Sequence, residues 1–397
     1  MSTGAGRKLR LGVAGLGRAF MLMLPTLVRH PRVTLAGAAD PRAEARERFA
    51  REFEAPAHAS VEALCADPSI DAIYVATPNE HHAAHAIAAA SAGKHVLVEK
   101  PMAISLAEAD AMIAAARTAA VHLVVGPSHS FDAPIARARA LIASGEHGAV
   151  RAIAAMYHTD FLYRPRRPEE LETAKGGGVL FSQAAHQVDV ARLLAGGRTL
   201  GVRASCGAWD RARPTEGAYG ALLAFEGGVF ATLAYNGYAH FDGDEFCDGI
   251  GETGFAKDPS AHGAARRALA AAGAREAEAK VARTYGGAAA PPRDEAPWHE
   301  HFGFVLVSCD RADLRPTAKG VHIYGDAERR FEAMPKPPVP RAPVLDELCA
   351  AALDGRPPRH DGAWGLATLE VCLAMLASSR EGREVRLARQ VPWDDRA

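Results

Sequence analysis

The sequence predicts an α/β protein whose N-terminal domain holds a parallel, doubly wound sheet and whose C-terminal domain is α+β, with an open, mostly antiparallel sheet. Short apolar runs of strand type alternate with helical patterns through residues 9–125, and their connections are short, which is typical of a parallel sheet. Beyond Gly126 the strand-type runs lengthen and a hairpin signal appears. We therefore expect two domains, at residues 1–127 and 128–397.

Composition and charge narrow the classes of partner. The chain has 397 residues, of which 48% are hydrophobic and 23% charged, as in ordinary globular proteins. Its formal net charge of -1 provides no field that would attract nucleic acid or an anionic membrane, so we expect a small-molecule substrate. Six cysteines form no C-x-x-C pair, and residues 1–10 lack the apolar core of a signal peptide. Both observations favour a cytoplasmic location.

The first predicted strand leads into a glycine turn. Residues 9–14 are apolar, and Gly15-Leu16-Gly17 follows directly, before an apolar helical run. This order suits a dinucleotide, because the first glycine allows the tight turn and the second lets the backbone approach a pyrophosphate. A full fingerprint has a third small residue where this chain has Phe20. The cofactor contacts expected in this turn are Gly15, Gly17, Arg18, Ala19 and Phe20.

The second predicted strand, residues 33–39, ends at Asp40. An acidic residue at this spacing is suited to the ribose hydroxyls of NAD. Arg42 follows shortly afterwards and is suited instead to the 2′-phosphate of NADP. We therefore expect NAD as the cofactor, with NADP as the alternative.

Two later strands also end in polar residues. Residues 72–76 run into Thr77-Pro78-Asn79, and residues 94–98 run into Glu99-Lys100-Pro101. The carboxyl ends of strands are where open α/β sheets bind their ligands. The cofactor contacts expected at these ends are Thr77, Pro78, Asn79, His82, Glu99 and Lys100.

Lys100 is also the expected catalytic residue. A lysine at a strand end, partly desolvated and close to Glu99, can donate a hydrogen bond to the oxygen of a carbon that gains or loses hydride. A surface Glu-Lys pair that caps an ordinary strand explains the same two residues equally well. The local pattern alone does not separate the two interpretations.

The second domain is expected to continue a sheet around an excursion. Its predicted strands are residues 150–157, 201–209, 219–225, 229–235 and 302–309. An insertion is expected at about 238–301, where an Ala/Arg/Glu helix, 264–284, lies between Gly-rich and Pro-rich segments. Closing helices are predicted at 344–353 and 366–379.

A glycine run followed by helical spacing marks the second candidate site. Gly176, Gly177 and Gly178 permit a close backbone approach to a flat ring, and residues 179–189 have helical spacing. His186 is the expected general acid or base, since the pKa of histidine lies near operating pH. A histidine bonded inside a helix–sheet interface is the commoner case. The helical residues expected to contact substrate are Ser182, Gln183 and Asp189.

A proline-stiffened basic segment offers a binding site for anions. Its expected substrate contacts are Tyr163, Arg164, Arg166 and Arg167. Arginines in this setting suit bidentate capture of carboxylates or phosphates, and a solvated loop or salt bridges between subunits are the alternatives. Residues 240–247 contain metal-ligand types, but their spacing matches no standard zinc or calcium pattern, so we expect no metal.

Together these motifs resemble the Gfo/Idh/MocA oxidoreductases. The resemblance depends on Gly15 to Gly17, Asp40, Ala76 to Asn79 with His82, the string Gly93 to Pro101, residues 176–189 and a tail from Asp361 to Val385. It implies a Rossmann domain, a second domain whose open sheet forms a homodimer or homotetramer, and hydride transfer with NAD or NADP. It further implies that Lys100 polarises the reacting oxygen, that His186 transfers a proton, and that Pro101 follows a cis bond.

One departure from the family pattern concerns Ser182, which stands where many members carry an aspartate four residues before the histidine. Lys100 and His186 must then act without a carboxylate at that position. The segments 163–167 and 302–316 resemble the branch that contains phthalate 4,5-cis-dihydrodiol dehydrogenase. This implies oxidation of a carboxylated cis-dihydrodiol, such as 4,5-dihydroxy-4,5-dihydrophthalate, to a catechol.

Two other functions remain open from the sequence. A sugar or cyclitol dehydrogenase would use the same cofactor and the same Lys100 and His186, with no need for the arginines. A non-catalytic regulator that binds a dinucleotide would need neither catalytic residue. Ser182, which stands in place of the family aspartate, is the feature that leaves the regulator as an alternative.

Overall fold

The structure is a computed structural model that describes residues 7–288 and 295–395. Residues 1–6 of the expected basic N-terminus and residues 289–294 of the expected insertion lie outside the described residues. The chain forms two compact units, and the first comprises Met1–Pro127, Lys280–Arg293 and Pro338–Leu366. The second comprises Ser128–Ala279, Asp294–Pro337 and Ala367–Ala397. The expectation assigned every residue after 127 to the second domain, whereas two later segments pack with the first unit.

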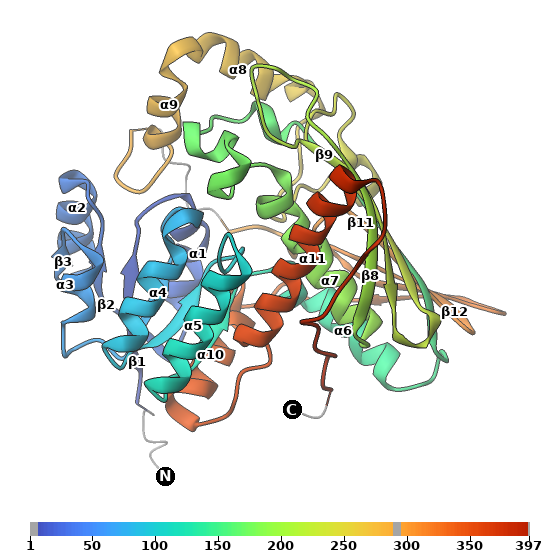
Figure 1. The fold of residues 1–397 in the computed structure, drawn as a ribbon, viewed down its shortest axis with the longest axis horizontal. Coiled ribbons are helices and arrows are strands. Elements are labelled where there is room, and N and C mark those ends of the chain that lie inside the picture. Colours follow the sequence, from blue (N-terminus) through green and yellow to red (C-terminus); the bar gives the residue numbers. More distant parts are fainter. Residues whose placement is uncertain (1–6, 289–294, 396–397) are drawn as a thin grey trace. The chain divides into compact units, whose positions relative to one another are not determined.

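The first unit contains a six-stranded parallel sheet, as the alternating pattern predicted (Figure 1). Its strand order is β3-β2-β1-β4-β5-β6, the order of a Rossmann fold. The strands are β1 (Leu9–Ala14), β2 (Val33–Ala39), β3 (Ala57–His58), β4 (Ala72–Val75), β5 (His95–Val98) and β6 (Leu123–Val125). The central strands β4 and β5 are almost wholly buried because helices cover both faces, which explains their continuous apolar runs.

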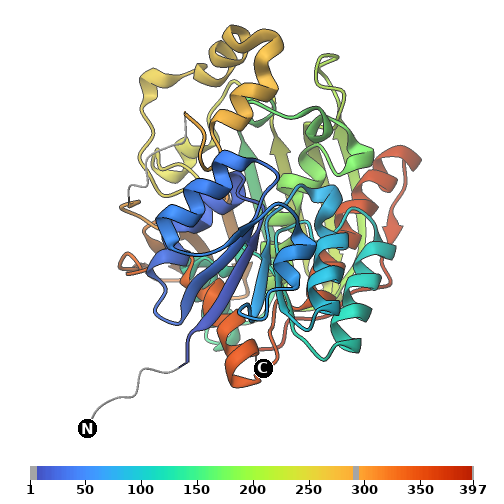
Figure 2. The same ribbon diagram turned by 90° about the vertical axis from the view of Figure 1, so that its left-hand side faces the viewer.

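Helices of the first unit flank this sheet (Figure 2). They are α1 (Arg18–Arg29), α2 (Ala43–Phe53), α3 (Val61–Cys65), α4 (His82–Ser91), α5 (Leu106–Thr118) and α10 (Ala342–Asp354). Helix α4 packs against α3 and α5, while α10 joins α1 from far along the chain. Thr26 donates a 2.7 Å hydrogen bond to the carbonyl of Pro340, and His30 lies 3.1 Å from Asp346. These contacts explain why residues 338–366 return to the first unit.

The second unit contains a nine-stranded sheet that is antiparallel except where β7 pairs with β10. Its order is β14-β13-β12-β11-β7-β10-β9-β8-β15. The strands are β7 (Val150–His158), β8 (Thr199–Gly207), β9 (Ala218–Phe225), β10 (Phe230–Asn236), β11 (Phe304–Cys309), β12 (Ala312–Thr317), β13 (Gly320–Gly325), β14 (Arg329–Ala333) and β15 (Val385–Arg386). The predicted hairpin joins β9 to β10, with Gly227 and Gly228 at φ values of 73° and 77°. Strands β12 to β14 were not predicted.

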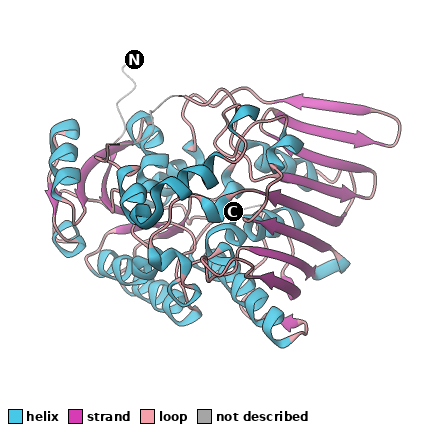
Figure 3. Ribbon diagram, turned by 90° about the horizontal axis from the view of Figure 1, so that it is seen from above, coloured by secondary structure: helices cyan, strands magenta, loops and turns pink. Residues whose placement is uncertain are grey.

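One face of this sheet is covered by α6 (Ala133–Ala143), α7 (Ala185–Ala195) and α11 (Gly362–Glu381), and Figure 3 shows the strands side by side. Alternate residues of β9 are exposed on the other face, as expected of an open sheet. Among the described residues, α11 alone is long and apolar enough to span a membrane by composition, and 78% of its apolar window is buried in the fold. That degree of burial fits a core helix.

Two helical predictions need correction. The helix expected at 264–284 is divided into α8 (Ala264–Ala272) and α9 (Glu276–Ala282), because Gly273 adopts a φ of 51° between them. The segment 179–189, expected to have helical spacing, contains instead a π-helical turn, Leu180–Ala184, before α7. Such a turn has more residues than an α-helical one, so the segment is not one regular α-helix.

Candidate active site

The glycine turn after β1 has the form that a dinucleotide needs. Gly15 has a φ of 96°, and a Cβ atom there would lie 2.7 Å from the carbonyl oxygen of Ala76. A Cβ at Gly17 would meet nothing within 4 Å, so the backbone is open where a pyrophosphate would approach. Helix α1 starts at Arg18 with no side-chain cap and no acidic residue in its first turn. The backbone N–H groups of this turn therefore suit an anion.

Phe20 occupies the position of the missing third glycine without separating helix from strand. Its side chain is fully buried, and its ring lies 6.3 Å from that of Phe49 and 5.2 Å from that of Tyr285. The Phe20 ring thus points toward α2 and Tyr285 and not into the turn. The side chain supports the fold beside the cofactor site, and contact of Phe20 with the cofactor stays a prediction.

Asp40 is buried at the end of β2 and accepts four hydrogen bonds. One carboxylate oxygen accepts from the backbone N–H of Leu16 at 2.8 Å and from Arg42 Nη2 at 3.0 Å. The other accepts from the backbone N–H and from Nε of Arg42, both at 2.9 Å. A carboxylate has about four acceptor sites, so a ribose hydroxyl must displace part of the Arg42 guanidinium to reach Asp40.

The returning segment 280–293 contributes residues that the sequence patterns did not mark. Arg42 Nη1 donates to Thr284 Oγ1 and, at 3.3 Å, to the carbonyl of Tyr285. The hydroxyl of Tyr285 donates to Glu52 at 2.8 Å, and Arg48 lies over its ring. The expected insertion therefore covers the end of β2, a contact between residues about 240 apart that no local pattern reports.

Glu99 and Lys100 directly follow β5, whose carboxyl end lies beside that of β4. Glu99 is buried and accepts a 2.5 Å hydrogen bond from the hydroxyl of Tyr74. Burial raises the pKa of Glu99, although Lys100 and Tyr74 oppose the shift. Lys100 is half-buried, and the bond to Pro101 is cis, as the family resemblance implied. Glu99 is thus a buried neighbour of Lys100, and the two residues do not form a surface Glu-Lys pair.

His82, an expected cofactor contact, links the segments that follow two strands. Its side chain is buried, with Nε2 at 2.8 Å from the carbonyl of Thr77 and Nδ1 at 2.8 Å from the carbonyl of Pro101. Burial lowers the pKa of His82 to about 4, so the ring is neutral and donates to one of these carbonyls. It therefore ties the ends of β4 and β5 together, while half-buried Pro78 and Asn79 begin the short turn before α4.

In the second unit, His186 lies in the first turn of α7, which follows the π turn. Its Nδ1 lies 3.4 Å from the hydroxyl of Ser128. Its ring centroid lies 4.6 Å from that of His129 and 4.8 Å from that of Phe302. A π turn often marks a functional position. The imidazole is therefore held among aromatic rings, with one hydroxyl beside it.

His129 was not predicted, yet its imidazole lies between two carboxylates. Its Nδ1 lies 2.6 Å from a carboxylate oxygen of Asp132, and its Nε2 lies 3.7 Å from that of Glu252. Burial opposes the charge, but Asp132 and Glu252 outweigh it and raise the pKa of His129 to about 9. His129 is therefore an imidazolium at neutral pH.

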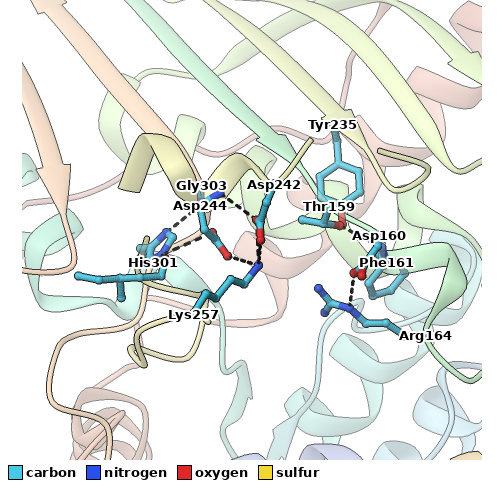
Figure 4. A network of polar contacts seen from close by, with 11 residues as sticks. Thr159, Asp160, Phe161, Arg164, Tyr235, Asp242, Asp244, Lys257, His301 and Gly303 are labelled. Carbon is cyan, nitrogen blue, oxygen red and sulfur yellow. Dashed lines mark hydrogen bonds and ion pairs between the residues drawn. The ribbon is translucent and has the colours of Figure 1, made fainter. Parts of the chain in front are cut away.

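Four aromatic residues, Tyr157, Tyr219, Tyr235 and Phe302, form a cluster beside His186. Phe302 lies 5.2 Å from Tyr157 and 6.2 Å from Tyr235, measured between ring centroids. Arg164 shares this environment and lies 3.3 Å from Asp160 (Figure 4). Burial works against its charge, but Glu252 and Asp160, with the neighbouring tyrosines, raise the pKa of Arg164 overall. This guanidinium thus remains charged beside a cluster of buried aromatic rings.

The other expected substrate contacts are mostly engaged within the second unit. Asp189 accepts hydrogen bonds from Ser130 and Thr368, and Ser182 donates a 2.6 Å bond to the carbonyl of Gly178. Gln183 is buried. Asp189 is directed toward Thr368 of α11, and contact of Ser182, Gln183 and Asp189 with a substrate stays a prediction.

The basic segment is likewise divided. Arg166 is buried with its guanidinium 3.6 Å from the ring centre of Phe161, and Arg167 lies near Glu170 on the surface side. Tyr163 is covered by Arg266 of α8, whose guanidinium lies 4.0 Å from its ring centre. Arg164 is therefore the arginine of this segment best placed beside the aromatic cluster.

The acidic loop contains a group of metal-ligand type, Asp244, Cys247 and His301. Lys257 lies 2.6 Å from Asp244 and 2.8 Å from Asp242, so an ammonium supplies the positive charge (Figure 4). Both ring nitrogens of His301 bond the backbone, at the carbonyl of Ile250 and the N–H of Gly303. The residues do not suit a metal, because the imidazole is engaged and burial raises the pKa of Cys247 to about 12.

Comparisons with known proteins identify the chain's relatives. Residues 9–127 match the model of an oxidoreductase family with an NAD-binding Rossmann fold, and residues 135–257 match the GFO/IDH/MocA C-terminal domain. A dehydrogenase of Comamonas testosteroni is 45% identical over 378 residues, which cover 94% of this chain and 95% of that protein. The chain belongs to the GFO/IDH/MocA oxidoreductases. Its first unit is thus an NAD-binding Rossmann domain, and the chain is a dehydrogenase.

Other relatives agree with this family assignment. The Comamonas protein is named 1-carboxy-3-chloro-3,4-dihydroxycyclo hexa-1,5-diene dehydrogenase. The human trans-1,2-dihydrobenzene-1,2-diol dehydrogenase is 31% identical over 194 residues, 48% of this chain and 57% of that protein. A crystal structure from Bordetella bronchiseptica RB50, assigned to the dehydrogenases, has 42% identity and a TM-score of 0.91, covering 96% of this chain and 100% of that one. This GFO/IDH/MocA member thus shares its fold with that dehydrogenase over 96% of its chain.

Proposed function

We propose that this dehydrogenase oxidises a carboxylated cyclic cis-diol to a catechol with NAD. The name of the Comamonas relative describes a ring with one carboxyl group and two adjacent hydroxyls. A dihydroxy-dihydrophthalate, the example drawn from the sequence, belongs to the same chemical class. The two lines of reasoning therefore meet at a flat, anionic ring diol.

The observation that carries this proposal is the placement of Arg164. Its guanidinium shares the environment of Tyr157 and Tyr235, whose rings pack on Phe302, and Phe302 packs on His186. A ring diol that lies on these aromatic side chains would present its carboxylate to the arginine and a hydroxyl to the imidazole. A neutral polyol has no carboxylate that this guanidinium could bind.

The chemistry divides between two residues. Lys100 donates a hydrogen bond to the carbinol oxygen, which stabilises the negative charge that develops there. His186 accepts the hydroxyl proton, as a neutral imidazole can. Bound NAD supplies the hydride acceptor for the hydrogen of the same carbinol carbon. The resulting ketone then shifts a ring proton to its oxygen and becomes an aromatic catechol, so loss of one hydride and one proton balances the oxidation.

The first unit would hold NAD in the manner its residues suggest. Gly15 and Gly17 leave the backbone open to the pyrophosphate, and the first turn of α1, with Arg18 and Ala19, supplies N–H groups. Asp40 would take the ribose hydroxyls once Arg42 moves aside. Thr77, Pro78 and Asn79 lie at the neighbouring strand end, where the nicotinamide half is expected, and His82 holds that end in position.

The open face of the second sheet is the proposed contact for a homodimer or homotetramer. Leu200, Leu222 and Phe230 are exposed on β8, β9 and β10 by 50%, 48% and 46%. Exposed apolar residues gathered on one sheet face mark an interaction surface. A cytoplasmic location completes the proposal, on the basis of the six free cysteines, which disulfide-forming compartments would oxidise.

The test is NADH formation from three substrates: a carboxylated cyclohexadiene cis-diol, the same diol without carboxyl, and a cyclic polyol. We expect the carboxylated diol to have the highest kcat/KM. Arg164→Gln should raise its KM roughly ten- to hundredfold, since a charged hydrogen bond contributes about 1.5–3 kcal/mol. Arg151→Gln, a surface variant 61% exposed in its side chain, is the matched control. Preference for the polyol, or an Arg164 variant that loses nothing, would defeat this assignment in favour of a sugar or cyclitol dehydrogenase.

A further inference from the structure

The family position that carries a carboxylate in many members holds Ser182 here, and its hydroxyl bonds the carbonyl of Gly178. No carboxylate of α7 takes its place, because Asp189 accepts from Ser130 and Thr368. The described contacts of His186 are instead Ser128, His129 and Phe302. Two carboxylates lie beside this cluster, those of Asp132 and Glu252, and both contact the imidazole of His129.

His129 is fixed from two separate segments. Asp132 stands at the start of α6, three residues along the chain, with its oxygen 2.6 Å from Nδ1. Glu252 comes from a small turn in the insertion, residues 249–257, and lies 3.7 Å from Nε2. The turn is itself held: Gly251 donates to Phe255 at 2.8 Å, and Lys257 donates to Gly249 at 2.8 Å.

The insertion turn is also tied to the strand end that carries Phe302. His301 donates through its ring to the carbonyl of Ile250 at 2.8 Å, and its backbone N–H donates to the carbonyl of Glu252 at 3.2 Å. Lys257 bridges Asp242 and Asp244 beneath it (Figure 4). Glu252 is therefore held beside His129 by a turn that has its own hydrogen bonds.

We propose that His129, clamped by Asp132 and Glu252, is a positioning residue that keeps the adjacent His186 in its proton-accepting state. An imidazolium with its ring centre 4.6 Å from that of His186 disfavours a second positive charge there. His186 then remains neutral to lower pH and can accept the carbinol proton over a wider range. This role rests on the proposed function, in which His186 is the base.

The charged and titratable groups around the pair are few among the described contacts. Asp132 of α6 and Glu252 of the insertion turn face His129, and His186 of α7 faces it from the other side. Arg164 and Tyr157 each interact electrostatically with Glu252. Both carboxylates favour the charge on His129, and burial opposes it. The proposal therefore places the positive charge on His129 and not on His186.

The experiment is a carbon-13 NMR titration of the histidine rings in the full chain, with His129 and His186 assigned from His129→Gln and His186→Gln. Asp132→Asn should lower the midpoint of His129 and raise that of His186 by on the order of one pH unit. His129→Gln should raise the His186 midpoint likewise, and Glu252→Gln should do so by less. Asp258→Asn removes a carboxylate of the insertion that bonds only Ser260 among the described contacts and should move neither midpoint.

Turnover provides a second readout. The acidic limb of kcat/KM for the diol should move upward by a similar amount in Asp132→Asn, with the alkaline plateau retained. A merely structural role would lower the plateau or the stability and leave the limb in place, and that result overturns the proposal. If Asp132→Asn does not fold, an unchanged His186 midpoint in Glu252→Gln overturns it alone. The NMR titration needs no substrate, so it decides this proposal even where the diol assignment fails.

Discussion

Cofactor selectivity should respond to Asp40→Asn, because this one substitution changes the charge that Arg42 faces. Asparagine keeps an oxygen for the backbone N–H of Leu16, now 2.8 Å from the carboxylate. Its amide would place a donor against the donors of Arg42, which lie 2.9 Å and 3.0 Å from Asp40. The Arg42 guanidinium would therefore lose its carboxylate partner and become available to a 2′-phosphate.

The expected effect follows from Coulomb's law. One unit charge pair at about 5 Å and an effective dielectric constant of about 20 interacts with about 3 kcal/mol. That energy corresponds to roughly a hundredfold change in the ratio of kcat/KM for NADP to that for NAD. The wild-type chain should prefer NAD, because Asp40 repels the phosphate and occupies Arg42.

The assay is steady-state kinetics with both cofactors on the same diol. The matched control is Asp71→Asn, which removes another aspartate paired with arginines, Arg7 and Arg10, before β4 and away from its carboxyl end. It should leave the cofactor ratio unchanged. An Asp40 variant whose ratio stays constant, or shifts further toward NAD, would refute the roles given to Asp40 and Arg42.

Three further predictions concern the first unit. Lys100→Met should lower kcat by at least about a thousandfold while NAD still binds, as titration of NADH fluorescence would reveal, because the main role proposed for the lysine is to stabilise the developing charge. Gly15→Ala should weaken NAD binding and lower the melting temperature, since its φ is 96° and the new Cβ would lie 2.7 Å from the carbonyl of Ala76; an unchanged Kd would contradict this. For Asp71, burial works against ionisation, but Arg10 outweighs it and lowers the pKa to about 2 from the usual 3.8. Its stabilising contribution is therefore present above pH 3.8 and is lost as pH falls through about 2, so Asp71→Asn should lower the free energy of unfolding by about 1 kcal/mol at pH 7, after allowance for solvent screening, and by nothing well below pH 2.

The first unit was largely predictable because its signals are local. A glycine turn, an acid at the end of β2 and a lysine at the end of β5 each follow directly from a short apolar strand. Parallel strands bring their carboxyl ends to one edge, so sequence order alone gathers these residues. Gly15, Asp40 and Lys100 could therefore be named from the amino-acid pattern by itself.

The second unit was less predictable because its cluster is assembled from distant segments. His129, Glu252 and Phe302 come from three parts of the chain, and none lies in a motif with a fixed spacing. The π turn before His186 has no composition signal, so the sequence pattern indicated ordinary helical spacing there. Tyr285 returns to the first unit by packing on Phe20, a tertiary contact that propensity does not encode.

The central claim is that Lys100 and His186 serve one chemical step. The most direct measurement is kcat for the carboxylated cis-diol in Lys100→Met, His186→Gln and the double variant, followed as NADH formation. Residues that act as a unit show strongly non-additive losses. We predict that the double variant is about as slow as the slower single variant. Losses that multiply, or a His186 variant with wild-type kcat across the pH range, would contradict the account.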